Sequence, residues 1–312
     1  MSAPQRARSL TVGLIGTGRV GSVLAAALAA AGHRIVAATG GSPDSLDRAA
    51  RLLPRVPLLP ADEVAARAEL VLVAGLAELG AWRPGQLVVH TSGAHGAAVL
   101  APAARAGART VAMHPAMTFT GDAADLDRLA GTSLGVTTAH PDAARALVAE
   151  LRGEPVEIAE ADRPLYHAAL VVGANYLVTL VNEAVDLLAR AGVPEPGRVL
   201  SPLLHAALDN ALRSGDAALT GPVSRGDAGT VAGHLEVLGE RVPDAVPGYA
   251  AMARLTAGRA LAAGRITPSQ AAPLVDVLAE AESPAPGPRV HAAGTPAPDV
   301  VTARVPRPRR PE

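Results

Sequence analysis

The sequence predicts an α/β domain with a doubly wound parallel sheet, followed by an all-helical domain. From residue 10 to about residue 160, short apolar strands alternate with helices, which is typical of a parallel sheet covered on both faces. After Asp162 no convincing strand follows, and long apolar helices take over. A chain of 312 residues is also long enough for about two domains.

In the first half, we expect strands at 10–15, 34–39, 70–74, 86–90, 110–113, 133–137 and 155–158. Helices are expected between them at 20–31, 42–53, 62–68, 97–106 and 142–151. Gly32 and Gly107 supply C-terminal stops, because glycine readily adopts the left-handed conformation that ends a helix. Ser42, Pro43 and Asp44 give an N-cap, a first-turn proline and an acid, so a helix begins there.

The second half is expected to be helical at 164–191, 197–213, 227–241, 244–263 and 268–282. Residues 283–312 are rich in Pro, Ala and Arg and carry almost no large apolar side chain, so we expect a disordered tail. The predicted boundaries are therefore 1–160 for the sheet domain, 161–282 for the helical domain and 283–312 for the tail.

Two residue types are missing from the chain. It has no cysteine, and inspection of the sequence shows that all 28 basic residues are arginine. These absences exclude a Schiff-base lysine, a phosphate-loop lysine, a thiolate nucleophile, a zinc–cysteine site and a disulfide. The nine histidines show no spacing typical of a metal site, so no metal is expected. A metal-dependent hydrolase is therefore the weakest interpretation.

Charge and hydropathy set limits on the partners. The net charge of −1 argues against general binding to nucleic acid or to an anionic membrane. The longest apolar run, 168–181, is shorter than the ~20 residues that span a bilayer. Glycines interrupt the apolar stretch near the N-terminus, so no signal peptide is expected. We therefore expect a soluble, cytoplasmic protein.

A glycine-rich turn lies between the first strand and the first helix and matches the pattern G-x-G-x-x-G. In this strand–turn–helix context the pattern is the Rossmann fingerprint for dinucleotides. Its first glycine permits the tight turn, the second lets the backbone approach the pyrophosphate, and the third permits close packing of helix and strand. The predicted cofactor-binding residues here are Gly16, Thr17, Gly18, Arg19, Val20 and Gly21.

The end of the second strand indicates which dinucleotide is bound. NAD enzymes usually place a carboxylate there, but this chain carries the hydroxyls of Thr39 and Ser42 instead. Arg19 or Arg48 is able to reach a ribose 2′-phosphate, so NADP is favoured over NAD. A structural alternative stays open, in which Ser42 is only an N-cap and Arg48 only a solvated helix residue.

Three further segments place polar groups at strand ends or in a loop. Ser92 follows the fourth expected strand and His114 ends the fifth, at the sheet edge where parallel sheets bind ligands. Arg225 and Asp227 lie in the third segment, between two helices of the second domain. Each has a structural alternative: Ser92 caps a turn, His114 bonds a carbonyl, or Asp227 is an N-cap.

The long helix expected at 164–191 also carries polar residues. Asn175, Asn182 and Asp186 share one face, while His167 lies about 12 Å before Asn175 and roughly 80° around an ideal helix. Such a polar edge is either the solvent side of the helix or part of a site. Because the helix follows directly from the sheet domain, we expect His167 and Asn175 to lie over the cofactor crevice.

These segments, in this order, resemble the two-domain proteins with a Rossmann-like first half and a helical second half called domain of unknown function 2520. The stretches that carry the resemblance are 16–21, 90–93, 114–119, 166–169, 175–176, 219–222 and 225–227. The family looks like a branch of the 6-phosphogluconate dehydrogenase-like reductases, which include ketopantoate, pyrroline-5-carboxylate and prephenate-type enzymes. The resemblance implies an NADP cofactor, a helical dimerisation domain and a site between the domains.

Two departures from that pattern bear on mechanism. Many relatives carry a catalytic lysine four residues before an asparagine of the long helix, a position occupied here by Val171. His167, one turn earlier, is the available replacement. The segment 75–83 after the third strand also looks shortened by around ten residues, in a loop that in the family lies beside the nicotinamide ribose.

The main hypothesis is an NADPH-dependent reductase acting on a C=O or C=N bond of a small polar substrate. His167 donates the proton, Asn175 hydrogen-bonds the reacting oxygen and Ser92 assists. His114 and Arg225 bind the substrate, and Arg225 takes its carboxylate. Ketopantoate, a 2-oxo acid, fits these residues, with a cyclic imine such as pyrroline-5-carboxylate as the nearest rival.

The alternative is a non-catalytic, regulatory dinucleotide-binding protein, which the shortened segment favours. In either case the apolar surface of the long helices predicts a homodimer. The sequence names neither the substrate nor the direction of the reaction.

Overall fold

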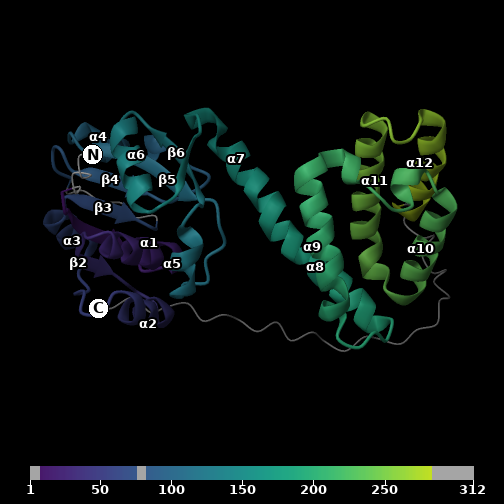
Figure 1. Cartoon of the computed structure of the whole chain (residues 1–312), viewed down its shortest axis with the longest axis horizontal. Coiled ribbons are helices and arrows are strands. Elements are labelled where there is room, and N and C mark those ends of the chain that lie inside the picture. Colours follow the sequence, from purple (N-terminus) through teal and green to yellow (C-terminus); the bar gives the residue numbers. More distant parts are fainter. Residues whose placement is uncertain (1–7, 76–81, 283–312) are drawn as a thin grey trace, which may run out of the picture. The chain divides into compact units, whose positions relative to one another are not determined.

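A seven-stranded sheet forms the first half of the chain (Figure 1). The computed structural model describes residues 8–75 and 82–282. The strands are β1 (Thr11–Ile15), β2 (Arg34–Thr39), β3 (Leu70–Val73), β4 (Leu87–His90), β5 (Arg109–Pro115), β6 (Ser133–Thr138) and β7 (Glu154–Glu157). They lie in the order β2-β1-β3-β4-β5-β6-β7, and all seven agree with the expected strands to within two residues at each end.

The direction of the last two strands differs from the expectation of an all-parallel sheet. β1 to β5 are parallel, but β5 pairs with β6 in antiparallel fashion and β6 pairs with β7 in parallel. The reason lies in the connection, since the only helix described between β5 and β6 is the six-residue α5 (Ala124–Leu129). The chain therefore re-enters the sheet at the edge it has just left, with Leu134 beside Pro115.

Helices cover both faces of this sheet, which confirms the doubly wound class. The helices of this part are α1 (Arg19–Ala30), α2 (Pro43–Leu52), α3 (Ala61–Arg67), α4 (Ala101–Arg105), α5 and α6 (Pro141–Glu150). One core joins α1, α5 and α6 to one face through residues such as Leu24, Leu129 and Leu147. A second core joins α3 and α4 to the other face through Val64 and Ala103. Alternate strand residues supply the two cores.

The remaining helices are α7 (Arg163–Leu170), α8 (Tyr176–Arg190), α9 (Pro196–Ser214), α10 (Ala228–Arg241), α11 (Val246–Ala262) and α12 (Pro268–Glu282). Helices α10, α11 and α12 share a third core. It consists largely of alanines on α11, such as Ala253 and Ala260, against Leu274 and Leu278 of α12. Small side chains let these helices approach closely, which suits a chain with 2% aromatic residues.

The chain divides into two compact units between Asn182 and Glu183, inside α8. The expected boundary at 160–161 marks the point where the sheet ends and the long helix begins. The first unit thus holds the sheet, α7 and the beginning of α8. The expected disordered tail, 283–312, lies outside the described residues.

The long helix contains a π-helical turn, Val171–Asn175, between α7 and α8, where the sequence suggested a regular α-helix. Its marker is a bond from the backbone N–H of Tyr176 to the carbonyl of Val171, five residues back. The whole helix, Glu160–Arg190, is 31 residues long with a mean hydropathy of 1.5 over its most apolar stretch. By length and composition alone it is long enough to cross a bilayer, unlike the shorter apolar run seen in the sequence.

Arg163 anchors the start of this helix to the sheet. Its side chain is fully buried, and three bonds hold its guanidinium. Nε donates to Thr137 Oγ1 at 2.8 Å, and Nη2 donates to the carbonyls of Ala112 and Gly135 at 2.9 and 3.0 Å. These acceptors belong to β5 and β6, so the first turn of α7 is fixed against the middle of both strands.

Replacing Arg163 by methionine keeps most of the side-chain volume but removes the charged donor that Ala112, Gly135 and Thr137 share. We expect the first unit to lose about 3 kcal/mol of stability in R163M, since a hydrogen bond to a charged group contributes roughly 1.5–3 kcal/mol. Urea unfolding followed by the fluorescence of Trp82 measures this, because the chain's single tryptophan packs against the second core.

The matched control is R145M on α6. Arg145 is 57% exposed and pairs with Asp142 and Glu157 at the surface, so its loss is expected to cost less than about 1 kcal/mol. Equal losses in R163M and R145M would show that Arg163 is not an anchor.

Candidate functional site

The glycine-rich turn has the geometry that the fingerprint predicts. Gly16 adopts a φ of 98°, a left-handed conformation, and its N–H donates to Thr39 Oγ1 at 2.8 Å. A Cβ on Gly16 would lie 2.9 Å from the carbonyl oxygen of Ala74. Glycine is therefore required here both by conformation and by space. The hydroxyl of Thr39, one of the predicted cofactor contacts, holds the turn.

The other two glycines of the turn differ from each other in their surroundings. A Cβ on Gly21 would lie 2.7 Å from Ala74 Cβ and would strike the carbonyl of Gly16, so Gly21 lets α1 pack against the end of β3. A Cβ on Gly18 would meet nothing within 4 Å. Gly18 thus leaves open space at the N-terminus of α1, where backbone N–H groups and the helix dipole favour a phosphate.

Arg48 lies across this turn. Its Nη1 donates to the carbonyl of Thr17 at 3.1 Å, and its Nε is buried without a hydrogen-bond partner among the described residues. The buried hydroxyl of Thr17 also lacks a described partner. Arg19 is exposed at the start of α1. Two orphaned polar atoms and two guanidinium groups therefore lie around the open side of the turn, which suits an anionic group.

Loop 117–121 closes over Arg48; residues 117–119 belong to a segment singled out in the sequence, but Thr120 and Gly121 do not. A Cβ on Gly121, whose φ is 85°, would lie 2.5 Å from Arg48 Nε. The fully buried carboxylate of Asp125 accepts hydrogen bonds from the N–H groups of Thr120 and Gly121, both at 2.8 Å. The sequence signal was an acid four residues after a glycine, at the start of a short helix that was not predicted.

Ser42 has the structural role that the sequence left open. It is the N-cap of α2, and its side chain accepts a bond from the N–H of Ser45 within a capping box. Its hydroxyl is thus already engaged with the backbone of α2.

A cavity of about 280 Å³ continues from the turn along the carboxyl ends of β3 and β4. Gly75, His90, Ser92 and His95 line it. Ser92 Oγ lies 2.9 Å from His95 Nδ1, and the buried His90 bonds the carbonyl of Gly96 through Nε2 at 2.8 Å. Ser92 thus lines the cavity together with His90, from the same segment singled out in the sequence, and with His95, which was not predicted. Most of segment 75–83, expected to be shortened, lies outside the described residues.

The end of β5 and the first turns of α7 bring three aromatic rings together. Tyr166 Oη lies 3.1 Å from His114 Nδ1, and the ring centres of His114 and His167 are 6.2 Å apart in an edge-to-face arrangement. A Cβ on Gly93 would lie 2.5 Å from His167 Cδ2 and 3.1 Å from His114 Nε2. Three separate segments, β5, α7 and the β4 loop, therefore meet at Gly93.

Burial controls the protonation of this cluster. Burial, together with the neighbouring charges of His167 and Arg163, lowers the pKa of His114 to about 4. Burial also lowers the pKa of His90, to which the charge of Arg163 contributes, while burial raises the pKa of the Tyr166 hydroxyl. At neutral pH the cluster therefore presents a neutral imidazole and a protonated phenol.

The π turn changes the relation between His167 and Asn175. A π turn accommodates one extra residue. The step of eight residues from His167 to Asn175 therefore turns the helix about as far as a step of seven residues does in a regular α-helix. Residues seven apart share a face. The turn thus moves the exposed Asn175 towards the face of His167, although the sequence placed the two roughly 80° apart.

In the second unit, Asp227 caps α10. Its carboxylate accepts from the N–H of Thr230 at 3.0 Å and from its hydroxyl at 2.7 Å, and these bonds lower its pKa. Arg225, the predicted carboxylate ligand, is exposed nearby. The structural alternative considered for Asp227 is therefore the observed role, and Arg225 stays available for a ligand.

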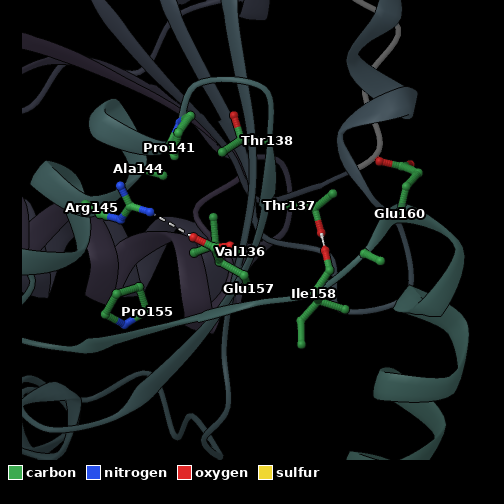
Figure 2. A pocket seen from close by; sticks show the side chains of 11 residues that line it. Val136, Thr137, Thr138, Pro141, Ala144, Arg145, Pro155, Glu157, Ile158 and Glu160 are labelled. Atoms are coloured by element: carbon green, nitrogen blue, oxygen red, sulfur yellow. Dashed lines mark hydrogen bonds and ion pairs between the residues drawn. The ribbon is translucent and has the colours of Figure 1, made fainter.

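A larger cavity, of about 550 Å³, lies away from these residues, beside α6, β6 and β7 (Figure 2). Its polar groups are already paired. Arg145 reaches Glu157 at 3.0 Å, and Thr137 Oγ1 donates to the carbonyl of Ile158 at 2.5 Å. We therefore place the site at the glycine-rich turn and the histidine cluster. Among residues 8–75 and 82–282, no three His, Asp or Glu side chains gather in a way that would hold a metal ion.

Two family models match the chain. The model described as a Rossmann-like domain matches residues 1–115, and the one described as a domain of unknown function (DUF2520) matches residues 134–256. No protein of curated function matches the sequence significantly.

Solved structures share the fold. A candidate NADP oxidoreductase from Bacteroides fragilis has a TM-score of 0.66 at 22% identity, covering 80% of this chain and 98% of that one. An imine reductase from Myxococcus stipitatus, in complex with NADP⁺, scores 0.57 at 17% identity over 82% and 95%. A 1-pyrroline-5-carboxylate reductase from Streptococcus pyogenes scores 0.52 at 18% identity over 81% and 98%. At these identities the likeness establishes the fold.

Proposed function

We propose that this chain, which belongs to the proteins that join a Rossmann-like domain to a DUF2520 domain, is an NADPH-dependent oxidoreductase. It reduces a C=O or C=N bond of a small polar substrate. One observation carries the proposal: the dinucleotide turn and a cluster of neutral proton-carrying side chains lie at the same edge of one sheet. Similar structures named as NADP-bound or imine-reducing proteins support it.

NADP is the dinucleotide that the chain's own residues favour. No carboxylate stands at the end of β2, so the negative charge that would repel a 2′-phosphate is missing. Arg48, with its unpartnered Nε, and the exposed Arg19 would hold that phosphate, while the N-terminus of α1 beside Gly18 would take the pyrophosphate. The nicotinamide, when bound, supplies the hydride.

The chain's own side chains supply the proton and the polar contacts. As the C=O or C=N carbon is reduced, negative charge grows on its oxygen or nitrogen. His167 protonates that atom, Asn175 donates a hydrogen bond to it and Ser92 assists from the cavity beside β4. His114 also contacts the substrate. Because the chain has no lysine, arginine is the only permanent side-chain cation for a substrate carboxylate.

Two substrate classes remain in competition. A 2-oxo acid such as ketopantoate presents a ketone beside a carboxylate, and a cyclic imine such as pyrroline-5-carboxylate presents C=N beside a carboxylate. The names of the similar structures favour the imine. The second candidate function, a non-catalytic NADP-binding regulator, rests on the shortened segment after Ala74.

The decisive experiment follows the loss of NADPH absorbance with panels of 2-oxo acids and cyclic imines. Turnover of either class supports the reductase, and H167Q is then expected to lower kcat by about 10²–10⁴-fold, the usual contribution of a positioned general acid. H140Q is the control, because His140 precedes α6, outside the cluster. Tight NADPH binding without turnover across both panels would favour the regulator, and an unchanged rate in H167Q would exclude the role of His167.

Arg48 provides a test of cofactor choice. We expect R48Q to raise the KM for NADPH at least tenfold and to leave the KM for NADH nearly unchanged, because only NADPH carries the 2′-phosphate. R51Q is the matched control, since Arg51 lies three residues later on α2, is 57% exposed and faces Asp122 at 3.7 Å. A parallel rise for both cofactors in R48Q would place Arg48 on the pyrophosphate instead.

We further infer that the chain forms a homodimer through its long helix. Apolar side chains on this helix lie in the open, including Leu165 at 72%, Val172 at 60% and Val178 at 59% exposure. A bilayer suits the helix less well, because Arg163, Tyr166 and His167 are packed onto the sheet. The free apolar part, 168–181, is then shorter than the ~20 residues that a bilayer needs.

Light scattering tests this inference. The chain is expected to have the mass of two copies, and V178E, which places a charge on the apolar face, is expected to lower that mass towards one copy. E183Q is a matched control on the same helix, because it changes a charge at an exposed polar position. A wild-type mass of one copy would contradict the dimer.

A further inference from the structure

Tyr166 is not used by the proposed function, yet it is held by a hydrogen bond, a ring contact and a glycine that leaves room for its hydroxyl. Its hydroxyl lies 3.1 Å from His114 Nδ1, and its ring is edge-to-face with that imidazole at 5.7 Å between centres. A Cβ on Gly135 would lie 2.6 Å from the same hydroxyl oxygen, so only glycine at this position of β6 leaves room for it. Arg163 Cζ lies 5.7 Å from the centre of the tyrosine ring.

The hydrogen-bond roles follow from counting protons. Burial raises the pKa of Tyr166, and it outweighs the charge of Arg163 and the nearby backbone of Gly135, which both favour the phenolate. The phenol therefore keeps its single proton, and a buried hydroxyl proton requires an acceptor. His114 Nδ1 is the acceptor within reach.

This assignment fixes the tautomer of His114. A neutral imidazole has one N–H and one bare nitrogen. When Nδ1 accepts from Tyr166, the proton must lie on Nε2. Burial and the charges of His167 and Arg163 oppose a second proton, because they hold the pKa of His114 near 4. His114 is thus a neutral imidazole with a defined donor at Nε2.

That donor points to the shared space of the cluster. A Cβ on Gly93 would lie 3.1 Å from His114 Nε2 and 2.5 Å from His167 Cδ2. Gly93 belongs to the loop that follows β4 and carries Ser92. A small group that touches His167 and the backbone near Ser92 would therefore also meet the Nε2–H of His114.

We propose that Tyr166 fixes His114 as its Nε2–H tautomer, and that this N–H donates a hydrogen bond to the reacting oxygen or nitrogen of the substrate. The second half rests on the proposed function. The proton itself comes from His167. His114 therefore donates a hydrogen bond to the same substrate atom that His167 protonates. Tyr166 is a positioning residue, and Arg163 holds the strands and the ring around it.

The second unit offers a matched comparison. Tyr249 Oη lies 2.8 Å from His234 Nδ1, with ring centres 5.8 Å apart and an interplanar angle of 87°. The first pair has nearly the same geometry, at 5.7 Å and 86°. His234, however, is exposed, whereas His114 is half-buried against Arg163. Y249F thus removes the same kind of bond elsewhere in the same protein.

Nitrogen NMR of ¹⁵N-histidine-labelled full-length protein tests the tautomer directly, because bare and protonated ring nitrogens differ strongly in chemical shift. We expect His114 to show a bare Nδ1 and a protonated Nε2 at neutral pH. Y166F is expected to mix the two tautomers of His114, and Y249F to leave His114 unchanged. The variant H114Q assigns the signal. If the His114 signals are the same in Y166F and in the unmodified protein, Tyr166 does not fix the tautomer of His114.

Kinetics test the role towards the substrate. We expect Y166F to lower kcat about tenfold and to leave the KM for NADPH unchanged. The loss is smaller than the roughly 10²–10³-fold cost of removing an oriented donor, because part of His114 keeps the Nε2–H tautomer. Y249F is expected to keep both values. A normal kcat in Y166F, together with mixed tautomers of His114, would overturn the hydrogen bond from His114 to the substrate. It would not overturn the role of Tyr166 in fixing the tautomer. If no substrate is turned over at all, the proposed function and the hydrogen bond from His114 to the substrate fail together. The NMR result alone then decides whether Tyr166 fixes the tautomer of His114.

Discussion

The burial of one guanidinium determines where the chemistry of this protein lies. Removing a permanent charge from water is costly unless its donors are matched by well-placed acceptors. Arg163 meets this condition at Nε and Nη2, through the hydroxyl of Thr137 and the carbonyls of Ala112 and Gly135, while its Nη1 has no partner among the described residues. An ammonium group would not span these three acceptors, because it lacks the planar fork of donors. Everything that follows Arg163 on α7, first Tyr166 and then His167, is positioned by that anchor.

Glycines then decide how closely the parts of the site approach one another. At Gly16 and Gly21 the turn lies against the end of β3, whereas at Gly93 and Gly135 the rings of His167 and Tyr166 lie against bare backbone. A side chain at Gly93 or Gly135 would move the neighbouring ring by about the width of a methyl group, enough to break a hydrogen bond of about 3 Å. The glycines, which allow this close approach, are therefore as important to the site as the side chains that carry protons.

The sequence predicted the parts of the molecule that depend on local pattern. Strand positions follow from apolar runs and the phosphate turn from its glycines, so both were found. The reversed direction of β6 was missed, because it depends on a loop that returns to the same edge. Arg163 and Tyr166 were missed for a related reason: a charged residue beginning a helix normally lies in solvent, and only tertiary contacts bury it. Their spacing of three residues, with His167 next, was the available signal.

The lack of lysine connects these observations. A lysine on the long helix would bring a mobile charge whose pKa shifts when it is buried. Here the cation nearest the cluster is instead an arginine that stays charged and cannot give up its proton. Burial lowers the pKa of His90 and His114, and the charge of Arg163 adds to this in the same direction, so both imidazoles remain neutral donors and acceptors. The fixed cation therefore helps to set the protonation of the cluster while taking no part in proton transfer itself.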